Sequence, residues 1–220
     1  NKIANPNKLN VIYNSLDYQT HIKLRNSSLS SQCYVRHFNN SFKNIFFIGR
    51  LTNYKRLDML IKVIPLLKEK SLNVNLTIIG DGETKSDLEK LAERLNVKKQ
   101  VWFFGETFDE NIIAEMIYNA DICVSPGNVG LTAIHSLSFG TPVITHNNFP
   151  FQGPEFEVIE PYKTGLFFEY NDVESLTNTI EEWFKRTLSD REIIRNNCYR
   201  IIDEKYNPHY QLEVIKSILS

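Results

Sequence analysis

The chain has 220 residues, with 25 basic and 26 acidic side chains and a net charge of −1. This balance gives no indication of nucleic acid as a partner, and the length suits one large α/β domain or two small ones. No apolar run reaches the roughly 18 residues of a membrane span, and we expect no signal peptide. Three widely spaced cysteines are typical of reduced thiols. We therefore expect a cytoplasmic protein, and the first residue, Asn1 rather than Met, indicates a fragment or a processed product.

Residues 1–43 show little periodic pattern and are basic, with Asp17 as their only acid. One apolar run, residues 9–13, predicts an edge strand. The rest is interpreted as a connecting segment. A solvated basic linker is favoured over a surface that faces an anion or a missing domain.

From Asn44 onward, apolar runs typical of buried strands alternate with amphipathic helical patterns. Strands are predicted at 44–50, 74–80, 101–105, 121–125 and 165–170. A further strand is predicted between the end of the helix at Phe139 and His146. Helices are predicted at about 56–70, with a kink at Pro65, and at 85–95, 110–119, 132–139, 172–186 (N-cap Asp172), 189–204 and 208–219. The pattern predicts a doubly wound parallel sheet of six strands in the order 3-2-1-4-5-6.

Four of these strands end in a glycine-bearing loop: Gly49-Arg50, Gly80-Asp81-Gly82, Gly105-Glu106 and residues 127–130. Ligands bind at the carboxyl ends of strands in open α/β sheets, so we expect the four loops to converge on one crevice. The last loop feeds a helix start, whose free N–H groups and positive dipole favour an anion such as phosphate. A plain tight turn explains the same glycines equally well.

Arg50 and Lys55 place two cations over this edge, where they could bind a phosphate; as an isolated pair they could equally be solvated. The chain lacks the G-x-G-x-x-G fingerprint of dinucleotide enzymes and the G-x-S-x-G elbow of hydrolases. It also lacks a D-x-D pair, and its five histidines show no ligand spacing. We expect no cofactor and no metal requirement.

Five segments, GRLTNYKRLD (49–58), TIIGDGE (77–83), VWFFGE (101–106), ADICVSPGNVGLTAIHSLSFGTPVIT (120–145) and KTGLFFEYND (163–172), resemble the C-terminal domain of retaining family-4 glycosyltransferases of GT-B architecture. The resemblance implies a Rossmann-like half of a GT-B enzyme, with a role in polysaccharide biosynthesis. Residues 44–186 would bind the donor, a UDP- or GDP-type nucleotide sugar. Residues 1–43 would be the interdomain connection. Residues 187–220 would pack toward a missing N-terminal acceptor domain, through which any membrane contact would occur.

Carried over by position, Arg50 and Lys55 match the catalytic pair that neutralises the donor diphosphate. The resemblance implies nucleotide-binding roles for Gly49, Gly80, Asp81, Gly82, Gly105, Glu106, Asn128, Gly130, Leu131, Thr132 and His135. Glu157 matches an acidic position that has no defined role.

The sequence departs from the family at its pair of glutamates separated by seven residues, which fall on Gly127 and His135. The first would contact the donor sugar and the second the ribose. The alternative is therefore a non-catalytic nucleotide-binding partner subunit, although Arg50, Lys55 and Gly130 favour an enzyme that is inactive as this isolated chain. His135 could bond one ribose hydroxyl or pack on Leu131 and Phe139.

Overall fold

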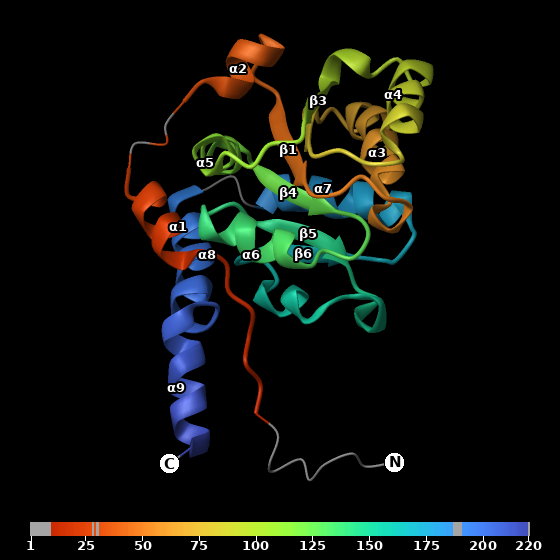
Figure 1. The fold of residues 1–220 in the computed structure, drawn as a ribbon. Coiled ribbons are helices and arrows are strands. Elements are labelled where there is room, and N and C mark those ends of the chain that lie inside the picture. The colour runs from red at the N-terminus through yellow and green to blue at the C-terminus, as the bar shows by residue number, and fades with distance from the viewer. Residues whose placement is uncertain (1–9, 28, 30, 187–190, 220) are drawn as a thin grey trace.

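The computed structural model describes residues 10–27, 29, 31–186 and 191–219. Its centre is a six-stranded parallel sheet in the order β3-β2-β1-β4-β5-β6, which confirms the predicted doubly wound topology (Figure 1). The strands are β1 (Lys43–Ile48), β2 (Val74–Ile79), β3 (Val101–Gly105), β4 (Ile122–Ser125), β5 (Val143–His146) and β6 (Gly165–Phe168). The order reverses between β1 and β4, and such a reversal opens a crevice at the carboxyl edge.

Helices cover both faces of the sheet, because its central strands are apolar on both sides. One core joins the sheet to α3 (Leu57–Glu69), α4 (Lys85–Arg94) and α7 (Val173–Arg186). The other joins it to α5 (Glu110–Asn119), α6 (Leu131–Ser138) and α8 (Arg191–Lys205). Short 3-10 turns lie at Asn53–Lys55, Lys98–Gln100, Phe149–Phe151 and Pro154–Val158. The helix α3 continues through Pro65.

The segment before β1 differs from the prediction. Residues 10–13 form no strand, and residue 9 lies outside the described part of the chain. Two helices, α1 (Tyr18–Arg25) and α2 (Cys33–Phe38), occupy the stretch interpreted as a linker. The helix α1 packs on α5 and α6 and buries His21, and Arg25 forms an ion pair with Asp203 of α8 at 2.7 Å. Tertiary contacts of single side chains, rather than an apolar stripe, therefore hold α1 in place.

Two features of the C-terminal part were predicted. Asp172 caps α7, because its Oδ1 accepts the Ser175 amide at 2.9 Å. The helix α8 was expected from residue 189, which lies outside the described residues, and it packs on α6. The last helix, α9 (Pro208–Leu219), extends away from the sheet (Figure 1). Among the described helices, none has the length and hydropathy that a bilayer crossing requires.

Candidate functional site

At the carboxyl edge of β1 and β2, the loops that follow the two strands pack against each other through their backbones. A Cβ on Gly80 would lie 2.1 Å from the Gly49 carbonyl oxygen, and one on Gly82 would lie 2.4 Å from the Leu51 oxygen. The Gly80 amide also donates to the Gly105 carbonyl at 2.8 Å. Because Gly80 has φ of +138°, only glycine satisfies both the torsion and the space. The predicted turns are thus held together by direct backbone contact.

A cleft of about 480 Å³ opens over this edge. It is lined by six of the predicted residues, Gly49, Arg50, Gly80, Asp81, Glu106 and His135, together with Ile48, Ile79, Thr107, Phe108, Glu110 and Ile113. Arg50 is exposed. Asp81 forms an ion pair with Lys85 at 2.9 Å, and this hydrogen bond lowers the pKa of Asp81. The cleft therefore has one cation, Arg50, whose charge no described acid neutralises.

The first turn of α6 lies next to the end of β1. Gly130 precedes the helix with φ of +51°. The Thr132 hydroxyl donates to the Ile48 carbonyl at 2.9 Å and so fixes the helix start to the strand. Within the described chain, the amides of Leu131 and Thr132 have no hydrogen-bond acceptor. Free amides at a helix start are suited to binding an anion.

Lys55 lies on the other side of the loop that precedes α6. Its Nζ donates to the Asn128 carbonyl at 2.5 Å, and the Gly127 amide donates to the Lys55 carbonyl at 3.1 Å. Burial lowers the pKa of Lys55. Residues of the other three loops line the cleft, but Asn128 and Lys55 do not, so the convergence of all four loops on one crevice stays a prediction. Hydrogen bonds turn the loop that precedes α6 toward Lys55.

Gly127, at the position of the first missing glutamate, has no room for a side chain. A Cβ there would lie 1.8 Å from the Tyr54 carbonyl oxygen and 2.8 Å from the Lys55 Cα. Both obstacles are backbone, so no side-chain rotation can relieve them. The loss of this acid is therefore built into the conformation of the loop.

His135, at the position of the second missing glutamate, faces the cleft but already has protein partners. Its Nε2 lies 2.6 Å from Glu110 Oε1, and the Nε2 of His21 lies 3.1 Å from the same oxygen. Burial by itself would raise the pKa of Glu110, but the hydrogen bonds from His135 and His21 lower it to about 2. The ring of His135 also stacks on His21 with centroids 5.1 Å apart.

Sequence reasoning missed two polar residues, Gln152 and Glu155, that act on the loop of residues 126–130 and on Lys55. Gln152 accepts the Val129 amide at 2.9 Å and donates to the Thr145 hydroxyl at 2.9 Å. Glu155 is buried, accepts from Asn14 at 2.7 Å, and raises the pKa of Lys55 against the effect of burial. Glu157, which the resemblance had selected, is exposed. The sequence carries no signal that distinguishes the two glutamates.

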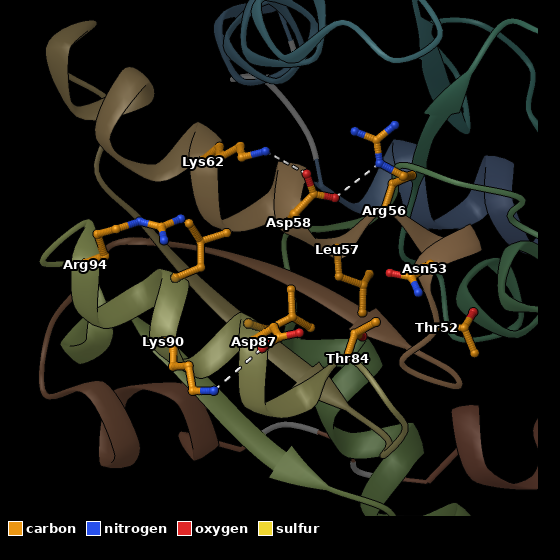
Figure 2. Close-up of a pocket in the computed structure, with 12 residues that line it drawn as sticks. Thr52, Asn53, Arg56, Leu57, Asp58, Lys62, Thr84, Asp87, Lys90 and Arg94 are labelled. Atoms are coloured by element: carbon orange, nitrogen blue, oxygen red, sulfur yellow. Dashed lines mark hydrogen bonds and ion pairs between the residues drawn. The ribbon is translucent and has the colours of Figure 1, made fainter.

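A second hollow, of about 570 Å³, lies between α3 and α4 (Figure 2). None of the predicted site residues lines it. Asp58 pairs with Arg56 and Lys62, and Asp87 pairs with Lys90, as the dashed lines in Figure 2 show. Arg94 lines the hollow as well, so four bases stand against two acids there. The smaller cleft is the better candidate site because residues predicted at the strand ends line it and do not line this hollow.

Known proteins of similar sequence include glycosyltransferases. The family "Glycosyl transferases group 1" matches residues 35–200. An uncharacterized glycosyltransferase of Methanocaldococcus jannaschii is 30% identical over 171 residues, 75% of this chain and 41% of its own. One from Haemophilus influenzae is 30% identical over 179 residues, 80% of this chain and 49% of its own. The chain thus spans about half the length of these relatives.

The fold has close structural counterparts. The crystal structure of Anabaena HepE in complex with UDP and glucose superposes with a TM-score of 0.75 at 20% identity, and covers 96% of this chain and 56% of that one. At this identity the likeness concerns the fold alone. The sequence match extends over three quarters of the chain, and it follows that this chain belongs to the group 1 glycosyltransferases.

Proposed function

We propose that the chain is the donor-binding domain of a retaining glycosyltransferase, which binds a UDP- or GDP-type sugar and transfers the sugar to an acceptor held by an N-terminal domain. The observation that carries this proposal is the contact between the end of β1 and the first turn of α6. The Thr132–Ile48 hydrogen bond ties the start of α6 to the end of β1, and Ile48 and Arg50 both line the cleft. An anion there would meet both a helix start and a guanidinium.

The chemistry follows from the charges. When the bond between sugar and phosphate breaks, negative charge develops on the leaving diphosphate. Arg50 and the α6 amides would stabilise that charge. Lys55 would add to this effect after its Nζ leaves the Asn128 carbonyl, to which it is hydrogen-bonded. Lys55 is partly buried, which strengthens its electrostatic effect. On this view the transfer needs no metal at the diphosphate.

The position of Gly127 favours a second candidate, a nucleotide-binding subunit that performs no transfer. The backbone of Tyr54 occupies the space that a family glutamate would fill, so the donor sugar would lack that contact. The two candidates share nucleotide binding and differ only in transfer.

Nucleotide binding is tested by titrating UDP, GDP and their sugars calorimetrically into wild type, Arg50→Ala and Lys55→Ala. Loss of one charge-assisted contact should weaken binding by about 1.5–3 kcal/mol. Lys68→Ala, which removes an exposed charge at the far end of α3, serves as the control and should bind as wild type does. Equal affinity in all four folded proteins would contradict the proposal.

Transfer is tested by assaying this chain alone and joined to its N-terminal domain. We expect transfer only from the joined protein, because the acceptor site lies in the other domain. Donor binding without transfer in the joined protein would favour the non-catalytic candidate.

A further inference from the structure

Three side chains that commonly ligate metals converge on the rim of the cleft. They are His21 of α1, Glu110 of α5 and His135 of α6, and their ligating atoms all lie within 4.8 Å of one another. Glu110 and His135 line the cleft, whereas His21 is buried behind them. Because the three residues come from three helices, their spacing in the sequence gave no indication of the cluster.

Both imidazoles bring Nε2 to the same oxygen of Glu110. Their rings are nearly parallel, at 5° and 5.1 Å, and both Nε2 atoms approach Glu110 Oε1, at 3.1 and 2.6 Å. Tetrahedral zinc with bonds of about 2.0–2.1 Å separates its ligand atoms by roughly 3.3 Å. The contact between His135 and Glu110 would have to widen by less than about 1 Å. The Glu110 side chain is 30% exposed and can make that movement. The two imidazoles would also have to turn, because the lone pair of each nitrogen lies in its ring plane and the two planes are nearly parallel.

We propose that His21, Glu110 and His135 bind a divalent transition metal of the zinc type, with a fourth coordination position open to the cleft. Two imidazole nitrogens and one carboxylate oxygen suit zinc, cobalt or nickel better than magnesium or calcium, which prefer oxygen ligands. Three protein ligands leave one position for water, as at open zinc sites. Asp17, which caps α1 and interacts electrostatically with both His21 and Glu110, adds negative charge nearby.

The metal would fasten α1 to the domain. The helix α1 is short and lacks an apolar stripe, and it contacts α5 and α6, which carry the other two ligands. A bound ion would hold the segment before β1 against the rim of the cleft, at the position where the family has its ribose-binding glutamate. This proposal does not rest on the proposed function, because side chains of this chain supply all three ligands and no nucleotide is needed to complete the site.

The test uses the whole chain, free of any affinity tag and dialysed against a chelator. Zinc chloride is titrated by calorimetry, and cobalt(II) is added as a spectroscopic probe. We expect one zinc per chain, a higher melting temperature with zinc, and visible cobalt absorption of the type given by nitrogen and oxygen ligands. His21→Gln and Glu110→Gln should each weaken zinc binding at least tenfold. His37→Gln, which replaces a histidine stacked on Trp102 outside the cluster, should not change it.

Three outcomes would overturn the proposal. The first is wild-type protein that takes up no zinc, which would leave a purely hydrogen-bonded cluster. The second is undiminished binding in both Gln variants. The third is a thiolate charge-transfer band from cobalt, which would place the metal at a cysteine such as the half-buried Cys33. If a variant fails to fold, the wild-type stoichiometry and cobalt spectrum still decide between these results.

Discussion

The two flanks of the cleft are built by different means. The phosphate flank consists of residues 49–51 and 80–82 and the adjoining loop 127–132. Its shape is set by the backbone, and glycines stand where a Cβ would lie within 2.4 Å of a backbone oxygen. On the histidine flank, residues 21, 110 and 135, the shape is set by three side chains from separate helices. The phosphate flank retains the family pattern at Arg50 and Gly130 but departs from it at Gly127, and the histidine flank departs from it at His135. A backbone-built site tolerates few substitutions, whereas a site built from side chains can change its chemistry by exchanging them.

The largest expected effect follows from replacing Gly127 on the phosphate flank. Gly127→Glu restores the family's acid in sequence, but its Cβ would lie 1.8 Å from the Tyr54 carbonyl. We expect Gly127→Glu and Gly127→Ala to lower the free energy of unfolding by at least about 3 kcal/mol, because the obstacle is backbone. Urea denaturation measures the loss.

Gly105→Ala is the matched control for that prediction. A Cβ on Gly105 meets nothing within 4 Å, but φ is +94°. The variant should therefore show only the torsional cost, about 1–2 kcal/mol. If Gly127→Ala proves as mild as Gly105→Ala, the loop can move, and the phosphate flank is less rigid than its contacts indicate.

The second prediction concerns His146, a buried histidine that forms no ion pair with a described acid. His146, at the end of β5, is 1% exposed, and its Nδ1 accepts the Asn148 amide at 3.2 Å. Burial lowers the pKa of His146 to about 4. The unfolded chain, with an ordinary pKa near 6.5, therefore binds more protons between these two values. Stability should fall by about 1–3 kcal/mol as the pH drops from 6.5 to 4.

The measurement is urea denaturation at pH 7 and pH 5. His146→Asn keeps an acceptor for the Asn148 amide and should lose much of the pH dependence. Burial also lowers the pKa of His37, so a His37→Gln variant measures the remaining contribution. A wild-type protein equally stable at both pH values would show that neither ring is held neutral.

The sheet could be predicted because the sequence signals for its strands and helices are local, each lying within the element that it indicates. Continuous apolar runs marked six strands, and the structure places both ends of five of them within one or two residues of the prediction. The remaining strand, β5, ends at His146 as predicted, and helical spacing marked α3, α4 and α5. Glycines at the strand ends marked the carboxyl edge, because few other residues fit there. These signals need no knowledge of distant contacts.

The rest depends on contacts between distant segments. The helix α1 was missed because its buried residue is His21, a polar side chain held by Glu110 and His135. Which way the loop of residues 126–130 turns depends on hydrogen bonds with Lys55 and Gln152. Such pairings have no periodicity, so sequence alone could identify His135 as facing the site but not its partners.

The third prediction reverses the exchange at His135. His135→Glu restores the family residue but sets a carboxylate beside Glu110, which now lies 2.6 Å from the imidazole. We expect a loss of about 1–2 kcal/mol of stability from like-charge repulsion at a partly buried position. Combining it with Glu110→Gln should recover most of that loss. Double-mutant analysis of urea denaturation measures the coupling, and simple additivity would show that the two side chains do not interact.

The smallest effect concerns how much nucleotide affinity His135 contributes. Its ring lines the cleft, yet its Nε2 is bonded to Glu110, so at most one nitrogen remains for a ribose hydroxyl. We expect His135→Ala to weaken UDP or GDP binding by about 0.5–1.5 kcal/mol, the scale of one neutral hydrogen bond. Calorimetric titration with chelator present removes any contribution of bound metal. Glu110→Gln separates a direct contact from positioning, because it retains the ring but loosens it. Weakening in His135→Ala alone indicates direct contact, equal weakening in both indicates that orientation by Glu110 matters, and wild-type affinity in both would leave nucleotide binding entirely to the phosphate flank.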